Sequence, residues 1–120
     1  MRRLSKLVSL KDCRSCPRRG NEPVFGRGST KDTSILFLGE APGQEEQEKG
    51  RPFVGKAGRL LTLVLESLVE SSEGEWPKRD IANVVSHAYF TNVCLCGTSK
   101  NKAPTVKEVD LCSTQLFETI

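Results

Sequence analysis

A short apolar run that ends at a glycine constrains the fold of this chain more than any other feature. Residues 35–38 read Ile-Leu-Phe-Leu, and Gly39 closes the run. Four consecutive apolar residues leave no polar face for solvent, which is typical of a strand buried on both faces of a parallel sheet. Such a strand requires neighbouring strands and a covering on both faces, so the run predicts an α/β fold.

The later segments alternate between helix and strand patterns. Apolar residues recur at i, i+3, i+4, i+7 and i+8 over residues 57–71, which predicts an amphipathic helix. Residues 88–93 cluster aromatic and β-branched side chains and predict a second strand. Thr105 and Glu108 form the Thr-x-x-Glu pattern of a capping box, so a further helix begins there. One face of that helix is expected to carry Val109, Cys112, Leu116 and Ile120.

The order strand, helix, strand and helix is typical of a right-handed βαβ unit in a mostly parallel sheet. Two strands make an incomplete sheet, so the sequence predicts part of a larger architecture. Before the first strand, Leu4, Leu7 and Val8 fall at helical spacing and predict a short helix. A basic, glycine-containing loop over residues 18–28 is expected to follow it. Residues 40–55 predict a long polar loop.

Five cysteines are a high and odd count for a chain of 120 residues with a formal net charge of +3. No apolar run approaches the roughly 20 residues of a membrane-spanning helix, so we expect a cytoplasmic protein that contacts no membrane. In a reducing compartment, thiols hold metal more often than they form disulfides. Cys13 and Cys16 form a Cys-x-x-Cys pair, and Cys94, Cys96 and Cys112 offer the two further thiolates of an iron-sulfur cluster or a tetrahedral zinc site. The alternative is that these are ordinary loop and core cysteines.

The segment Gly-Glu-Ala-Pro-Gly follows the first strand at positions 39–43. Open α/β sheets bind ligands just beyond the carboxyl ends of their strands. Gly39 and Gly43 permit a sharp turn and a close approach of the backbone to a ligand, and Glu40 offers a carboxylate there. A tight loop with a solvated glutamate explains the same five residues equally well.

Residues 50–57 come close to the phosphate-binding pattern G-x-x-x-x-G-K-S/T. Ala57 lacks the hydroxyl that would hold Mg²⁺, and Pro52 has no N–H to donate to a phosphate. The preceding strand also ends well before Gly50. The sequence therefore argues against a loop that hydrolyses nucleoside triphosphates.

Together, these motifs resemble the iron-sulfur uracil-DNA glycosylases of family 4. The resemblance rests on Cys-x-x-Cys at 13–16, Gly-Glu-Ala-Pro-Gly at 39–43, Gly-Arg-Pro-Phe-Val-Gly-Lys-Ala-Gly at 50–58, and Thr-Asn-Val at 91–93 followed by Cys96 and Cys112. It implies a three-layer α/β/α fold with a mostly parallel sheet. It also implies a four-iron four-sulfur cluster and the hydrolytic removal of uracil from DNA, which initiates base excision repair.

The resemblance further implies roles for individual residues in the site. Uracil flipped out of the base stack would lie on the ring of Phe53. The Asn92 amide would accept from uracil N3–H and donate to O4, a pattern that cytosine inverts. Glu40 would position or activate water against the sugar carbon. The turn that contains Ala41 and Gly43 would bind the uracil and stabilise its anion as it departs.

The cluster ligands and the cationic residues also follow from the resemblance. The four ligands would be Cys13, Cys16, Cys96 and Cys112, which leaves Cys94 for packing. The side chains near the DNA backbone would be Arg51, Lys56 and Arg59. Zinc remains the alternative metal for the same cysteines.

The family's last motif, a His-Pro segment after a fourth strand, has no counterpart in this sequence. The resemblance therefore implies one domain over residues 1–120 that lacks the carboxyl-terminal strands of the family. We expect a monomer that binds uracil-containing DNA. The alternative, from another functional class, is a non-catalytic iron-sulfur or zinc module of the same fold that binds nucleic acid or serves structure only.

Overall fold

A small mixed sheet positions two of the motifs identified in the sequence. In the computed structural model, which describes residues 22–71, 78–97 and 102–119, three strands occur: β1 (Arg27–Gly28), β2 (Ile35–Gly39) and β3 (Ala88–Asn92). Their order is β1-β3-β2, with β2 parallel and β1 antiparallel to β3. The parallel pairing places Gly39 directly beside Asn92, so two of the expected site motifs meet at one end of the sheet.

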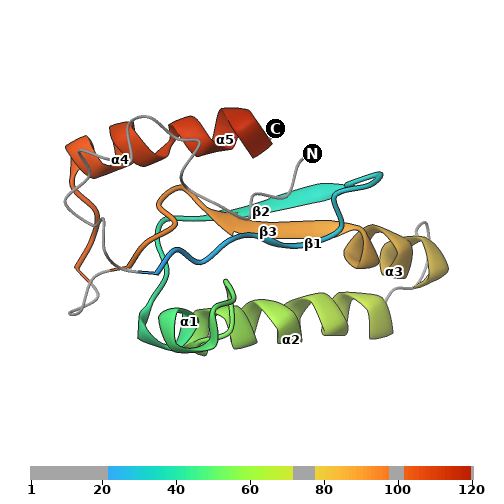
Figure 1. Cartoon of the computed structure of the whole chain (residues 1–120). Coiled ribbons are helices and arrows are strands. Elements are labelled where there is room, and N and C mark those ends of the chain that lie inside the picture. Colours follow the sequence, from blue (N-terminus) through green and yellow to red (C-terminus); the bar gives the residue numbers. More distant parts are fainter. Residues whose placement is uncertain (1–21, 72–77, 98–101, 120) are drawn as a thin grey trace.

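Helices cover both faces of this sheet (Figure 1). The helices α1 (Gln44–Lys49), α2 (Lys56–Glu70) and α3 (Lys78–Ser86) connect β2 to β3. The helices α1 and α2 lie on one side of the sheet, and α3 lies at the end where β3 begins. The helices α4 (Val106–Cys112) and α5 (Thr114–Thr119) follow β3 and lie on the other. The expected α/β/α layering, the two parallel strands and the amphipathic helix that links them are confirmed.

The central strand β3 forms the core. Four of its five residues are buried, and Tyr89 is among the most deeply buried side chains of the described residues. The Tyr89 ring lies directly against Gly26, where a Cβ atom would collide with it. Beyond the carboxyl end of β3, the N–H of Val24 donates to the carbonyl of Leu95 at 2.7 Å, and both side chains are buried. The segment before β1 is thereby fixed to the segment after β3.

The expectation that residues 35–38 are buried on both faces is wrong. Ile35 and Leu38 are 40% and 46% exposed. The reason is the strand order, because β2 is at the edge of the sheet and pairs only with β3 in the described part of the chain.

Two segments that were expected to be loops contain regular structure. Arg27 and Gly28 form β1, since pairing with β3 satisfies backbone groups at what would otherwise be an open edge. The segment 40–55 contains α1, whose first turn carries Glu45 and Glu46 and so complements the helix dipole. That helix ends at Gly50, which has a left-handed φ of 70°.

The helical regions also differ in detail from the sequence expectations. The helix α3 had not been predicted. The expected single helix after Thr105 divides at Ser113 into α4 and α5. Ile120, the amino-terminal helix with Leu4, Leu7 and Val8, and residues 18–21 of the basic loop lie outside the described residues. Among the described helices, none is long and apolar enough to cross a membrane.

The predicted capping box of α4 is confirmed. The Thr105 Oγ1 accepts from the N–H of Glu108 at 3.2 Å, and the N–H of Thr105 donates to Glu108 Oε1 at 2.8 Å. Glu108 is buried although its side chain is polar, because these reciprocal bonds satisfy it. This box fixes the start of the helix that carries Cys112.

Replacing Thr105 should destabilise the protein through the loss of this cap. We expect Thr105→Ala to lower the free energy of unfolding by about 1 kcal/mol, measured by urea denaturation. Thr105→Ser keeps the hydroxyl and should lose little. Equal stabilities for the two variants would show that the cap contributes nothing.

Candidate functional site

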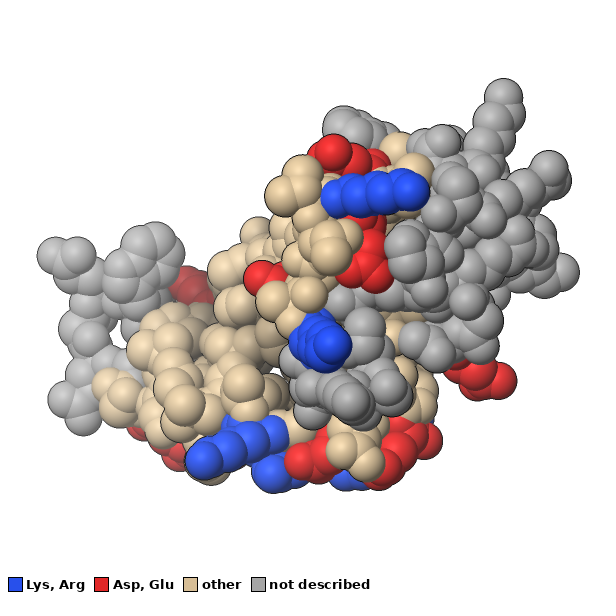
Figure 2. Space-filling view, turned by 90° about the vertical axis from the view of Figure 1, so that its left-hand side faces the viewer, with Lys and Arg blue, Asp and Glu red and all other residues tan. Residues whose placement is uncertain are grey.

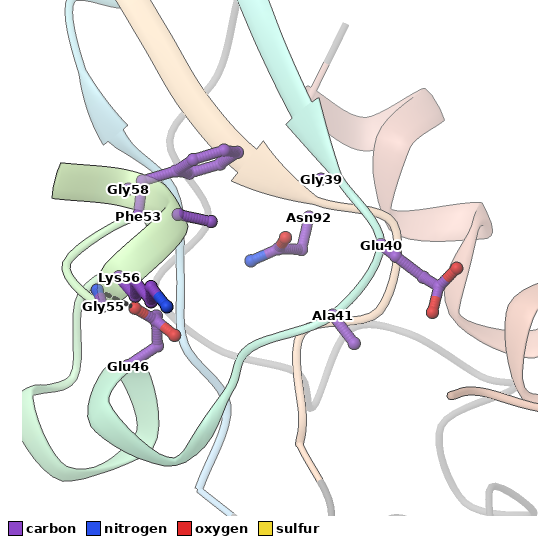
Figure 3. Close-up of a pocket in the computed structure, with 10 residues that line it drawn as sticks. Gly39, Glu40, Ala41, Glu46, Phe53, Gly55, Lys56, Gly58 and Asn92 are labelled. Atoms are coloured by element: carbon purple, nitrogen blue, oxygen red, sulfur yellow. Dashed lines mark hydrogen bonds between the residues drawn. The ribbon is translucent and has the colours of Figure 1, made fainter. Parts of the chain in front are cut away.

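A pocket with a cavity of about 240 Å³ opens at the carboxyl ends of β2 and β3 (Figure 3). It is smaller than the roughly 300–1,000 Å³ typical of sites for drug-sized ligands, which suits a small ligand. Its lining residues come from the end of β2 and the turn after it, from α1, from the loop before α2, from the first turn of α2 and from the end of β3. They are Gly39, Glu40, Ala41, Glu46, Phe53, Gly55, Lys56, Ala57, Gly58 and Asn92.

The side chain of Asn92 points into this pocket, and its residue is 5% exposed. Gly39 lies immediately beside it, since a Cβ atom at Gly39 would collide with Asn92 Oδ1 and lie 3.1 Å from Phe53 Cζ. Only glycine at this register position leaves room for both side chains. The backbone carbonyl of Asn92 accepts from Gln115 Nε2 at 3.0 Å, so α5 fixes the strand end from the other face of the sheet.

The ring of Phe53 forms a wall of the pocket and belongs to an aromatic cluster. It meets the ring of Phe90 edge to face with centroids 5.6 Å apart, and Phe90 stacks on Phe37 at 5.0 Å. Phe53 has a φ of +58°, a left-handed conformation that costs a non-glycine residue about 1–3 kcal/mol. The surroundings must therefore hold it there. Gly58 of α2 is part of these surroundings, because it lies so close to the Phe53 backbone that a Cβ atom at Gly58 would collide with it.

The carboxylate of Glu46 binds backbone N–H groups from two segments. Its Oε1 accepts from Gly43 N–H at 3.1 Å, and its Oε2 accepts from Val54 N–H at 3.0 Å and from Gly55 N–H. Gly43 and Gly55 are the N-cap residues of α1 and α2. One acidic side chain thus joins the starts of two helices and shapes the loop that carries Phe53.

This arrangement corrects one expectation and supports another. The Gly43 N–H donates to Glu46 and Pro42 has no N–H, so within the 40–43 turn the N–H groups of Glu40 and Ala41 are the remaining candidates for anion stabilisation. The loop before α2, which resembles a phosphate-binding loop in sequence, donates N–H groups to Glu46 instead. The structure therefore agrees with the argument against a nucleotide-hydrolysing loop.

Glu40 borders the pocket but does not face Asn92. It is exposed, and Figure 3 shows its carboxylate turned away from the Asn92 amide. The two residues lie at adjacent strand ends, so rotation about the Glu40 side-chain bonds is what would bring the carboxylate toward the pocket.

The three cationic residues expected near DNA differ in their surroundings. Lys56 borders the pocket and is exposed, as is Arg51. Arg59 forms an ion pair with Glu45 at 2.9 Å and donates to the Val54 carbonyl at 3.2 Å. Figure 2 views the molecule from the left-hand side of Figure 1. On this face the Lys and Arg side chains are interspersed with acidic ones and do not form one patch.

The cysteine segment after β3 packs on the turn that follows β2. Backbone pairing continues past the strands, with the N–H of Cys94 donating to the Glu40 carbonyl at 2.9 Å. Cys94 and Cys96 are buried, and Cys112 Sγ accepts from the Leu95 N–H at 3.3 Å. Two of the expected ligands, Cys96 and Cys112, therefore come from neighbouring segments. Among the described residues no group of three or more His, Cys, Asp or Glu side chains is placed to hold a metal, and Cys13 and Cys16 lie outside them.

Sequence reasoning missed three residues that build the site. Glu46 follows Gly43 by three positions, which is the spacing of a capping-box acid, and that signal was available. Arg27 donates to the carbonyls of Pro52 and Phe53, and Gln115 binds the end of β3. Neither shows a local pattern, because its partners are distant in sequence.

Comparison with known proteins gives one family match and several relatives. A family model described as the uracil DNA glycosylase superfamily matches residues 25–120. A type-4 uracil-DNA glycosylase of Thermotoga maritima is 38% identical over 121 residues, which cover 98% of this chain and 56% of that protein. The proteins of the same name from Archaeoglobus fulgidus and Pyrobaculum aerophilum are 36% and 37% identical, over 92% and 98% of this chain and 50% and 54% of theirs. The chain thus spans about half the length of these relatives, and the resemblance seen in the motifs is confirmed.

Neutralising Glu46 should destabilise the protein more than neutralising a neighbouring glutamate. A glutamine offers one acceptor oxygen and cannot replace two carboxylate oxygens, so we expect Glu46→Gln to lower the free energy of unfolding by about 1.5–3 kcal/mol. Chemical denaturation measures the change. The matched control is Glu48→Gln on the same helix, an exposed residue whose carboxylate accepts from Gln44 Nε2 at 3.2 Å, with an expected change within about 0.5 kcal/mol. Equal effects of the two variants would contradict the bridging role of Glu46.

Proposed function

The chain belongs to the uracil-DNA glycosylase superfamily, and on that premise we propose that its pocket binds a uracil flipped out of DNA and that the protein hydrolyses the N-glycosidic bond, which initiates base excision repair. One observation carries the proposal. An aromatic ring and a carboxamide, those of Phe53 and Asn92, line the same small pocket and both lie against Gly39. The relatives named as type-4 uracil-DNA glycosylases support the same reaction.

Asn92 supplies the chemistry for base recognition. Its carboxamide oxygen accepts from uracil N3–H, and its amide group donates to uracil O4. Cytosine presents an acceptor at N3 and a donor at N4, so both contacts become unfavourable. Burial of Asn92 strengthens this discrimination, because a mismatched partner leaves a polar group unpaired away from water.

Phe53 supplies the stacking surface that replaces the neighbouring bases of the duplex. A flipped nucleotide loses its stacking energy, and contact with an aromatic face restores part of it. The pocket is small, so bulky bases are excluded by size. The rigid wall formed with Phe90 and Gly58 favours one orientation of the bound base.

Bond cleavage needs water at the sugar carbon and stabilisation of the departing uracil anion. We assign the first task to Glu40, which borders the pocket and whose exposed carboxylate would turn toward it by a change of rotamer. The N–H groups of Glu40 and Ala41 are the donors we assign to the second. Arg51 and Lys56 would contact the phosphates on either side of the flipped nucleotide.

We also propose that Cys13, Cys16, Cys96 and Cys112 hold a four-iron four-sulfur cluster. Cys96 and Cys112, the two ligands among the described residues, fit such a cluster. The Leu95 N–H donates to Cys112 Sγ and so stabilises a thiolate there, and hydrogen bonds of this kind are typical around cluster sulfurs. When bound, the cluster would crosslink the segments that carry its ligands. A Cβ atom at Gly97 would collide with Gln47 Nε2 and with the Pro42 carbonyl, so the segment after Cys96 lies close to the turn beside the pocket and a crosslink there would stiffen that turn.

Excision of uracil is the direct test of the proposed reaction. We expect the purified chain with its cluster to generate abasic sites in a uracil-containing single-stranded oligonucleotide. Asn92→Ala removes two hydrogen bonds of about 1 kcal/mol each, so kcat/KM should fall about 30-fold.

Asn83→Ala, an exposed asparagine on α3, is the matched control and should leave kcat/KM unchanged. Binding of the oligonucleotide without excision, with the cluster intact, would instead favour the non-catalytic module.

The cluster ligands can be tested by comparing two buried cysteines two positions apart. Cys96→Ala should lose most of the iron, the sulfide and the broad visible absorption, because it removes a ligand. Cys94→Ala should retain all three, because Cys94 is assigned to packing. A colourless wild-type protein with one zinc per chain would overturn the cluster, and equal losses in both variants would overturn the ligand assignment.

A further inference from the structure

Arg27 connects β1 to the loop that carries Phe53, although no motif of the sequence singles it out. Its Nε donates to the Pro52 carbonyl at 2.8 Å, and its Nη2 donates to the Phe53 carbonyl at 3.4 Å. The carbon of its guanidinium lies 4.4 Å from the centre of the Phe90 ring. Arg27 and Phe90 are direct partners across the β1–β3 pairing, so the sheet register sets this contact.

These contacts converge on the strained residue of the pocket. The two carbonyls belong to consecutive residues, and the second is Phe53 itself, which has its φ at +58°. The Phe90 ring lies under the Arg27 guanidinium and also packs edge to face with the Phe53 ring. Arg27 thus holds the backbone of Phe53 and covers the ring against which its side chain packs.

The environment of Arg27 argues against a role in binding DNA phosphates. The side chain is partly buried, and burial, with the charge of Arg51 as the second cause, lowers the pKa of Arg27. An arginine nevertheless stays protonated in proteins, so the group retains its donors and its charge. Two of those donors are directed at the loop, and Arg27 does not line the pocket.

We propose that Arg27 is a positioning residue that fixes the 52–53 loop and thereby presents the ring of Phe53 as the base-stacking surface of the pocket. The loop-fixing part stands on geometry alone, and the link to base stacking rests on the proposed function. Lysine should be a poor substitute, because a single ammonium cannot donate in a planar fork to two successive carbonyls while stacking on an aromatic ring.

The first arm of the test measures loop order without any ligand. We compare ¹⁵N order parameters of the Phe53 and Val54 amides in the wild-type chain, Arg27→Lys, Arg27→Ala and the exposed control Lys31→Ala. We expect values of about 0.85 in the wild type and the control, below about 0.6 in Arg27→Ala, and between these in Arg27→Lys. Phe90 in the sheet should stay ordered in every variant. Unchanged order at Phe53 in both Arg27 variants would overturn the proposal.

The second arm measures affinity for two single-stranded oligonucleotides that differ only in one uracil or thymine. We expect the preference for uracil to fall about fivefold or more in Arg27→Ala and less in Arg27→Lys, while affinity for the thymine strand stays the same. Equal weakening of both strands would overturn the link to base stacking and indicate a phosphate contact. A wild-type chain with no preference for uracil would overturn the proposed function, and the first arm would still decide whether Arg27 fixes the loop. Arg27→Lys keeps the test decisive if Arg27→Ala fails to fold.

Discussion

The carboxylate of Glu46 is the interaction on which the geometry of the pocket depends. It accepts from the N–H groups of Gly43, Val54 and Gly55, which lie at the starts of α1 and α2. Helix starts present N–H groups without internal partners and a partial positive charge, so a negative charge placed between two of them satisfies both. The chain between these starts is consequently closed into a loop, and Phe53 is held on its inner side. Without the Glu46 carboxylate, these three N–H groups would have to donate to water instead.

Close approach of backbone and side chains then sets the shape of the site. Gly39 admits the Asn92 amide and the Phe53 ring at the end of the sheet, and Gly58 lets the first turn of α2 contact the Phe53 backbone. Arg27 holds the other side of the same residue. Three elements therefore stabilise the left-handed φ of Phe53, a conformation that no local preference would select. Strain is retained at the residue to which we assign base stacking.

Local patterns predicted much of this architecture, and distant contacts account for what they did not predict. The capping box at Thr105 and Glu108, the amphipathic α2 and the parallel β2 and β3 follow from spacing and composition over short windows. The exposure of Ile35 and Leu38 depends on strand order, which spacing within one strand does not encode. The roles of Arg27 and Gln115 depend on partners across the sheet and on its other face. Asn92 and Phe53 do line one pocket as the motifs implied, whereas the Glu40 carboxylate is turned away and the N–H of Gly43 donates to Glu46.

The proposed function requires that Asn92 and Phe53 form a site that distinguishes uracil from cytosine. Titration of the isotope-labelled chain with each free base, followed through the side-chain amide signals of Asn92 and the ring signals of Phe53, tests it most directly. Uracil should shift both sets of signals in a saturable manner, and cytosine should shift them much less, because it inverts the donor and acceptor that face the amide. Equal shifts with the two bases, or shifts only in the signals of residues other than Asn92 and Phe53, would contradict this requirement.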